Sequence, residues 1–186
     1  MEMKKKFKSF DKRLLHWFND TIKCKVLDRF MYRITNLGGG IFTTIILLAM
    51  IVFGKEKIRV AGIEGLTSLS VSQIFVQVLK KSLQRERPYN ILKNINTFGI
   101  NLRDYSFPSG HTTASFSIAT TMTLNFPSIS VILVILALTI GISRMYLGVH
   151  YPTDVIAGIV IGISSAVIIH FQFIELVEKF SYIIYN

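Results

Sequence analysis

Residues 131–154 read VILVILALTIGISRMYLGVHYPTD, and this stretch decides the fold class. It begins as an uncharged apolar run and ends in a cluster of polar side chains around Arg144 and His150. Towards the N-terminus the apolar character continues, so that residues 105–143 carry no charged side chain apart from His111. These 39 residues are too many for one membrane span of about 20 residues. The turn signal at residues 125–128, Asn-Phe-Pro-Ser, therefore predicts two spans joined by a short turn.

The composition also favours a membrane protein. Of the 186 residues, 51% are hydrophobic and 17% are charged, which argues against a disordered chain and is unusual for a small soluble domain. The net charge of +10 suits nucleic acid, an anionic membrane surface or an anionic substrate. Because the apolar runs favour the last two, we expect no nucleic-acid partner. The single cysteine, Cys24, excludes an intrachain disulfide and a cysteine metal cluster. The oligomeric state stays open.

Three further apolar segments complete the predicted fold. Residues 34–54 contain no charged residue, residues 60–79 contain only Glu64, and residues 155–174 form the last span. We therefore expect an all-α protein, a polytopic transmembrane helix bundle of about five spans. Residues 34–186 are expected to form its one transmembrane domain.

Some residues within these spans have structural interpretations. Glu64 lies near the end of its span, so its side chain is expected to snorkel towards the interface. Gly158 and Gly162 form a pair of small residues suited to close helix packing. His170 is expected to be an interfacial or packing residue.

The N-terminal segment, residues 1–33, differs from the spans. It starts MEMKKKFKSF, which resembles the basic start of a signal peptide, but charged residues 11–13 replace the apolar region that should follow. We therefore expect no cleaved signal. From Phe10 to Ile34, apolar residues recur at spacings of about three and four, with basic residues between them. The pattern predicts one amphipathic helix, or two short ones, lying in the membrane interface. Packing against the protein's own helices is the alternative.

Residues able to carry chemistry collect at the span ends in three groups. These groups are Lys80 with Arg87 and Pro88, then Pro108-Ser109-Gly110-His111, and finally Ser143-Arg144 with His150 and Asp154. Counting membrane crossings places all three groups on the same side of the membrane. Two histidines, three cations and an acid are therefore predicted to converge on one pocket.

The first two groups suit an anionic ligand. Lys80 and Arg87 are two helical turns apart, so they share a face if the helix continues, and Arg87 offers a fork that matches a phosphate edge. Pro88 would then stop that helix. Ser109 would cap the next helix, and Gly110 would let a ligand approach the free N–H groups at its positive end. Taken alone, both groups are also typical of interfacial anchors and helix caps.

The third group is more specific. Pro152 is expected to be the first residue of the last helix, which places Asp154 in its first turn and His150 just ahead of it. The acid can accept a hydrogen bond from one nitrogen of His150 and leave the other as a nucleophile. Arg144 is a further phosphate clamp, and His111 at its helix start is a candidate general acid. Three nearby cations would repel a metal, so we expect neither a metal nor a cofactor.

These residues resemble the three signature motifs of a known family. Lys80-x6-Arg87-Pro88, Pro108-Ser109-Gly110-His111 and Ser143-Arg144-x5-His150-x3-Asp154 are similar to those of the type 2 phosphatidic acid phosphatases. This family is also called the lipid phosphate phosphatases and is related to the vanadium haloperoxidases. All three motifs are complete and in order, and the similarity covers residues 80–154 directly. The chain looks like the shorter, five-span bacterial members.

The resemblance implies a metal-independent phosphatase of the cell membrane. His150 would attack phosphorus to form a phosphohistidine, Asp154 would orient His150, and His111 would protonate the leaving oxygen. The expected substrate is a lipid phosphomonoester or pyrophosphate, namely undecaprenyl pyrophosphate, phosphatidylglycerol phosphate or phosphatidic acid. The loop of residues 89–105, with Arg103 and Asp104, is expected to shape the choice of head group. The phosphate oxygens would be held by Lys80, Arg87, Ser109, Gly110 and Arg144.

The side of the membrane and the function each have an alternative. The distribution of basic residues favours a cytoplasmic site, whereas the resemblance implies an extracytoplasmic one. We expect the extracytoplasmic side, because substrate-binding and interfacial cations distort the charge count. A non-catalytic carrier of lipid phosphates is the alternative function, although binding alone needs no nucleophile. Peroxidase chemistry with bound vanadate, as in the related haloperoxidases, is disfavoured by the membrane spans.

Overall fold

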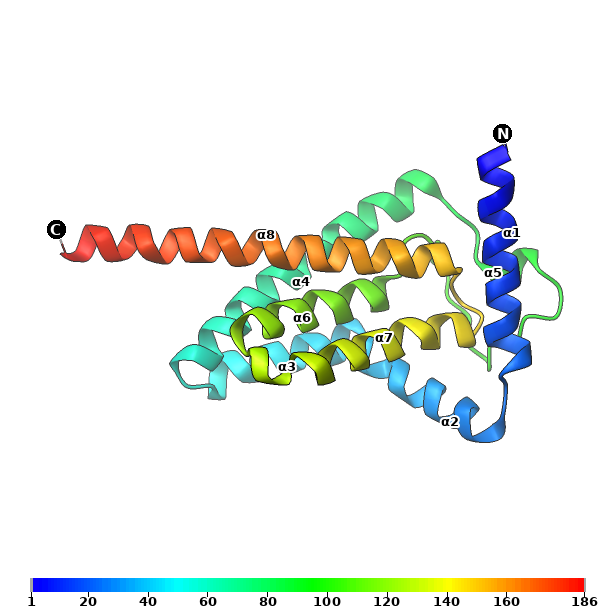
Figure 1. The fold of residues 1–186 in the computed structure, drawn as a ribbon, viewed down its shortest axis with the longest axis horizontal. Coiled ribbons are helices and arrows are strands. Elements are labelled where there is room, and N and C mark those ends of the chain that lie inside the picture. The colour runs from blue at the N-terminus through cyan, green and yellow to red at the C-terminus, as the bar shows by residue number, and fades with distance from the viewer. Residues whose placement is uncertain (1, 186) are drawn as a thin grey trace.

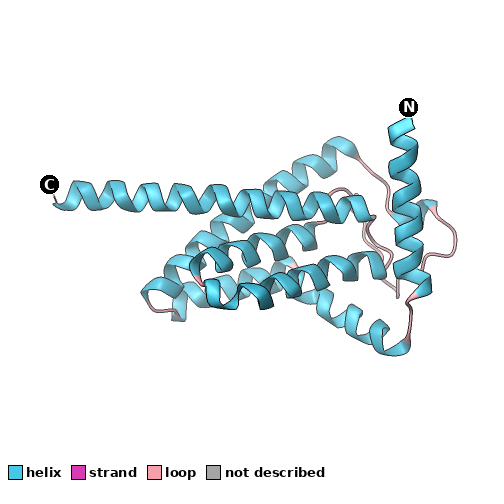
Figure 2. Ribbon diagram, viewed as in Figure 1, coloured by secondary structure: helices cyan, strands magenta, loops and turns pink. Residues whose placement is uncertain are grey.

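The computed structural model describes residues 2–185, and every regular element in that range is helical (Figures 1 and 2). The predicted all-α fold is therefore confirmed. In chain order the elements are α1 (Glu2–His16), η1 (Trp17–Thr21), α2 (Lys25–Ile34), η2 (Thr35–Gly38), α3 (Gly40–Phe53), α4 (Glu56–Leu83), α5 (Pro88–Ile91), α6 (Gly110–Asn125), η3 (Pro127–Ile129), α7 (Ser130–Tyr146) and α8 (Pro152–Tyr185).

Two helical segments of the described chain are long and apolar enough to cross a membrane, Pro127–Tyr146 and Pro152–Leu176. The pair Lys25–Gly38 and Gly40–Phe53, bent by 53° at its break, adds a third candidate. Helices also lie at all five predicted spans. However, α3 has 14 residues and α6 has 16, so each alone is shorter than the roughly 20 residues of a full span.

Helix α6 lies at the centre of the bundle and packs against α4, α7 and α8 (Figure 1). The contact with α8 is closest at two glycines. A Cβ atom added to Gly158 would lie 2.9 Å from the backbone oxygen of Ser109, and one added to Gly162 would lie 2.6 Å from that of Thr113. The predicted close packing at this glycine pair is therefore confirmed, and it brings the start of α6 against the start of α8.

Most predicted helix boundaries are confirmed, and one is wrong. Helix α6 ends at Asn125 in the predicted turn, and α8 begins at Pro152. The expectation that α4 continues to Arg87 is wrong, because Gln84 adopts a left-handed conformation, with φ of 45°, that ends the helix. Arg87 therefore belongs to a loop. Pro88 does not stop α4 but is the first residue of α5, where its missing N–H costs no hydrogen bond.

The N-terminal segment forms two helices, one of the two predicted arrangements. Helix α1 runs across the end of the bundle where α8 begins, and α2 leads back towards α3 (Figure 1). Leu15 of α1 is fully buried in a cluster with Tyr151, and Met31 of α2 is buried in a cluster with Tyr146. Both helices thus pack against the bundle with part of their surface, while Trp17 and Phe30 are exposed.

The expected snorkelling of Glu64 is wrong. Its side chain is buried between helices, where Oε1 lies 2.9 Å from Nδ1 of His170 in α8 and Oε2 accepts a hydrogen bond of 2.9 Å from Asn125 at the end of α6. A carboxylate inside an apolar bundle needs such partners, because unpaired it would carry the full cost of desolvation. His170 is a packing residue, as predicted.

We predict that Gly162→Ala lowers the free energy of unfolding by about 1–3 kcal/mol, because the added methyl group meets backbone atoms that cannot turn away. Thermal unfolding of the detergent-purified protein measures this effect. Gly40→Ala is the matched control, since a Cβ at that position meets nothing within 4 Å. Equal unfolding temperatures for the two variants would contradict the prediction.

Candidate active site

A cavity of about 210 Å³ opens at the end of the bundle where the longest loops gather (Figure 2). Arg87, Asp104 and His150 reach it from the loops, and helices α4, α6 and α7 contribute the rest of its polar wall. Asp154 and Ser109 lie behind the wall and are fully buried. Six of the eight predicted site residues line the cavity, namely Lys80, Arg87, Gly110, His111, Arg144 and His150.

Two of the cations share one carboxylate. Lys80, in the last turn of α4, forms an ion pair with Oδ2 of Asp104, and Nη2 of Arg87 donates to Oδ1 at 2.6 Å. Partial burial would raise the pKa of Asp104, but the hydrogen bond from Lys80 and the charge of Arg87 outweigh it and lower the pKa to about 2. The carboxylate is therefore ionised at neutral pH. It pairs with Lys80 and Arg87, two cations that could otherwise hold an anionic ligand.

The third cation, Arg144, is compensated less completely. Its side chain is 2% exposed, and Nη1 donates to the hydroxyl oxygen of Thr35 at 2.7 Å. Its Nε has no hydrogen-bond partner among the residues that the structure describes. A buried guanidinium with an unused donor beside a cavity is suited to an anion that enters the cavity.

His150 is held with one nitrogen as an acceptor. Nη1 of Arg87 donates to the backbone oxygen of Val149 at 2.9 Å and lies 3.3 Å from Nε2 of His150. Because arginine has no acceptor, Nε2 must offer its lone pair, and the proton resides on Nδ1. Burial, together with the charges of Arg144, Arg87 and Lys80, holds the pKa of His150 well below its usual range. The imidazole is therefore neutral and suited to nucleophilic attack.

Asp154 lies in the first turn of α8, as predicted. Its Oδ2 is 3.5 Å from Nδ1 of His150 and accepts a hydrogen bond of 2.9 Å from the backbone N–H of Tyr151. Its Oδ1 accepts a hydrogen bond of 2.6 Å from Arg85. The predicted hydrogen bond is not formed, because Nδ1 of His150 has no hydrogen-bond partner among the residues that the structure describes, but the acid faces this nitrogen from a fixed position.

The start of α6 presents His111 and Gly110 to the cavity, but not Ser109. The Ser109 hydroxyl accepts from the backbone N–H of Thr112 at 3.4 Å and from its hydroxyl at 2.9 Å. The predicted helix cap is confirmed. The hydroxyl of Ser109 is therefore engaged in capping α6.

From the sequence, Asp104 had only a general place in a head-group loop. Thr35 and Arg85, which contact the predicted residues Arg144 and Asp154, and Asp11, which contacts Arg85, were missed. Their signals are weak, because each makes its contact over a long separation in sequence. Arg85 and Asp154, for example, are 69 positions apart. A charged residue two positions from Arg87 could have been singled out, but nothing in the spacing names its partner.

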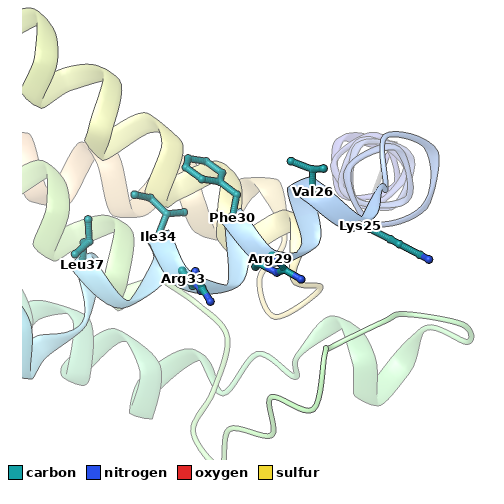
Figure 3. A pocket seen from close by; sticks show the side chains of 7 residues that line it. All are labelled: Lys25, Val26, Arg29, Phe30, Arg33, Ile34 and Leu37. Atoms are coloured by element: carbon teal, nitrogen blue, oxygen red, sulfur yellow. The ribbon is translucent and has the colours of Figure 1, made fainter.

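A larger cavity, of about 570 Å³, is a groove along α2 that lacks the predicted site residues. Figure 3 shows Val26, Phe30 and Ile34 pointing to one side of the helix, while Arg29 and Arg33 point to the other. The groove therefore lies along the surface of the amphipathic helix α2. The smaller cavity, with its histidines and cations, is the candidate active site.

Residues from all three motifs thus come together around one cavity. Residues 62–177, more than half of the chain, match the sequence profile of the PAP2 superfamily. The chain belongs to the PAP2 superfamily.

Relatives within the PAP2 superfamily cover most of the chain. This chain is 33% identical over 159 residues to the undecaprenyl-diphosphatase BcrC of Bacillus subtilis (strain 168). The aligned residues cover 83% of this chain and 79% of that protein. The crystal structure of Aquifex aeolicus LpxE superposes with a TM-score of 0.77 at 31% identity, covering 86% of this chain and 93% of that one. A transmembrane PAP2 type phosphatidylglycerolphosphate phosphatase from Bacillus subtilis gives a TM-score of 0.74 at 26% identity, covering 90% and 86%.

We predict that Asp104→Asn tightens the binding of orthovanadate, a phosphate analogue, because the amide no longer competes for Lys80 and Arg87. The expected gain is about fivefold, the equivalent of about 1 kcal/mol for a half-exposed carboxylate. Isothermal titration calorimetry of the detergent-purified protein measures it. Asp20→Asn, at an exposed residue paired with His16, is the control. Unchanged or weaker binding by Asp104→Asn would show that the carboxylate does not occupy the anion site.

Proposed function

We propose that this protein is an integral membrane phosphatase that hydrolyses a lipid diphosphate or phosphomonoester. The observation that carries the proposal is a neutral His150 whose Nε2 lone pair shares one cavity with Lys80, Arg87 and Arg144. A non-catalytic lipid carrier would need the cations but not the nucleophile.

The first step of the proposed reaction is a transfer of the phosphoryl group to His150. Nε2 attacks phosphorus, a P–N bond forms, and the P–O bond to the leaving group breaks. His111, which the negative charge of the bound phosphate would keep protonated, gives that proton to the leaving oxygen. The three cations and the backbone of Gly110 hold the equatorial oxygens, and this fixed positive field stabilises the charge of the transition state.

The second step restores the enzyme. His111, now neutral, takes a proton from a water molecule that attacks phosphorus, and the P–N bond breaks to release inorganic phosphate. Asp154 orients His150 in both steps and stabilises the positive charge that the ring carries in the phosphohistidine. The reaction needs no metal, because the side-chain cations stand where a metal ion would otherwise neutralise charge.

The helix bundle suits a site at a membrane surface. We propose that α3, α4, α6, α7 and α8 cross the bilayer and that residues 1–33 lie in its interface. Large apolar side chains point outwards along these helices, and Ile41, Phe53 and Val131 are each at least 70% exposed. The basic and apolar faces of α2 suit the boundary between head groups and acyl chains (Figure 3). The cavity would then open on the extracytoplasmic side.

An apolar cavity of about 180 Å³ between α3, α6 and α7 could take the lipid tail. Gly38 separates it from the active-site cavity, which Gly38 lines. A Cβ on Gly38 would lie 2.7 Å from the hydroxyl of Ser115 and 2.6 Å from Ile140, both of which line the apolar cavity. A head group on the cations and a tail beside α3 would therefore meet at this glycine.

Among lipid substrates, a polyprenyl diphosphate is the first candidate. The long match to an undecaprenyl-diphosphatase supports it, because most of both chains is covered. Phosphatidylglycerol phosphate is the second candidate, supported by the structural similarity to a phosphatidylglycerolphosphate phosphatase.

We predict that the purified protein releases phosphate from undecaprenyl pyrophosphate in the presence of EDTA, and more slowly from phosphatidylglycerol phosphate and phosphatidic acid. His150→Ala and His111→Ala should each lower turnover by at least about 10³-fold, the usual cost of removing a group that takes part in the reaction. Phosphate release with each lipid measures both effects.

His16→Ala is the matched control, because the side chain of His16 on α1 is 45% exposed and pairs only with Asp20 among the described residues. Wild-type turnover by His150→Ala would contradict the mechanism. Vanadate-sensitive binding of the lipids without any phosphate release would favour the carrier.

We also predict that Ala119→Phe raises KM for undecaprenyl pyrophosphate by about tenfold. Ala119 is buried in the wall of the apolar cavity, and a ring there removes the space for a tail. Turnover of a short, water-soluble prenyl diphosphate should change little, which also reports that the variant folds. Ile132→Phe, at a position 69% exposed on α7, is the control. Equal losses with the long and short substrates would place the tail elsewhere.

A further inference from the structure

The carboxylate of Asp154 is held from the side opposite His150. Its Oδ2 faces His150, and its Oδ1 accepts a hydrogen bond of 2.6 Å from Nη1 of Arg85. Arg85 lies in the loop after α4 and outside the cavity wall. The guanidinium of Arg85 therefore reaches the reacting group through Asp154.

Arg85 is itself fixed on several sides. Nη2 donates to Oδ2 of Asp11 at 2.6 Å, and Nη1 also donates to the hydroxyl of Thr153 at 2.7 Å. The guanidinium carbon lies 4.0 Å from the centre of the Tyr151 ring, close enough for a cation–π contact. A planar group with three such contacts has little freedom to turn, so it fixes the direction in which Asp154 points.

Asp11 connects this arginine to the N-terminal helix and to the start of α8. Its side chain is 4% exposed. Oδ1 accepts the backbone N–H of Thr153 at 3.0 Å, and Oδ2 accepts the Thr153 hydroxyl at 2.7 Å. Figure 1 shows α1 crossing the bundle beside the first turn of α8. The N–H group of Thr153 has no partner within α8, because it lies in the first turn of the helix. A carboxylate from α1 thus accepts its hydrogen bond, in the same turn that carries Asp154.

We propose that Asp11 and Arg85 are positioning residues for the reaction, acting on His150 through Asp154. The inference rests on the proposed phosphatase function and adds α1 to the parts that the reaction requires, although Asp11 lies outside the residues matched to the PAP2 profile. Two buried carboxylates share one guanidinium here. Without Arg85 they would repel each other, and Asp154 would turn away from Nδ1 of His150.

The test compares kcat and KM of Arg85→Gln, Arg85→Lys and Asp11→Asn with those of the wild type. Arg85→Gln should lower kcat about 10- to 100-fold, the range for outer partners that orient a metal-bound histidine, and leave KM within about twofold. Asp11→Asn should lower kcat by a smaller factor. Arg85→Lys should recover part of the loss, because an ammonium still pairs with Asp154 but cannot bridge both acids in the same plane.

A double-mutant cycle separates positioning from general support of the fold. If Asp11 acts through Arg85, adding Asp11→Asn to Arg85→Gln should cost nothing further in kcat. Glu86→Gln, at the exposed neighbour of Arg85, and Asp20→Asn, in the segment after α1, are the matched controls. Thermal unfolding of each variant accompanies the kinetics, and Asp11→Asn carries the test if Arg85→Gln does not fold.

The outcomes distinguish this inference from the proposed function. Phosphate release that depends on His150 but is unchanged in Asp11→Asn and Arg85→Gln overturns the positioning role alone. Variants that raise KM with kcat unchanged, or that lose activity only in proportion to the loss of folded protein, also overturn it. Release that survives His150→Ala overturns the proposed function, and the positioning role falls with it.

Discussion

The burial of three cations around one cavity is the constraint on which the rest of the structure depends. Lys80, Arg87 and Arg144 are at most 6% exposed, and taking each from water costs several kcal/mol unless partners replace the solvent. The partners present compensate the three buried charges only in part. Asp104 serves two of the cations, whereas Arg144 has a hydroxyl of Thr35 and an unused Nε. The protein thus maintains a positive cavity in an apolar bundle, and we propose that an anionic ligand completes it.

Rigid helix ends hold two of these cations, Lys80 and Arg144, in place. Close packing at Gly158 and Gly162 seats the start of α6 against the start of α8, and a hydrogen bond of 3.1 Å from the backbone N–H of Ser109 to the backbone oxygen of Asp154 ties the two ends together. At the other end of α6 and α8, Glu64 of α4 joins both helices through Asn125 and His170. Polar contacts at both ends therefore fix the spacing of helices whose remaining contacts are apolar and permissive of sliding.

The part of this arrangement that could be predicted from the sequence is the part with local causes. Pro152 fixes a helix start, and the motif spacing identifies His150 and Asp154 without any knowledge of the fold. The structure differs from the sequence-based prediction where a single residue or a contact between distant residues determines the conformation. The left-handed conformation of Gln84 takes Arg87 off its helix, and no helical periodicity encodes it. The partners of Arg85 lie 69 and 74 positions away, so their pairing is a property of the folded bundle and not of the pattern.

Buried cations need a counter-charge, whereas an open site must admit an anionic ligand. The position of Asp104 in a loop meets both requirements. Its carboxylate is 49% exposed and comes from a loop, whereas Lys80 and Arg144 come from helices that cannot move without opening the core. In the proposed reaction, a phosphate would therefore displace the carboxylate while the cations stay where they are. One anion then replaces another, and neither the empty nor the occupied cavity leaves Lys80 and Arg87 unpaired. In this proposal, the exchange keeps the preorganised positive site stable between turnovers, and it makes binding weaker than the charge of the cavity alone would allow.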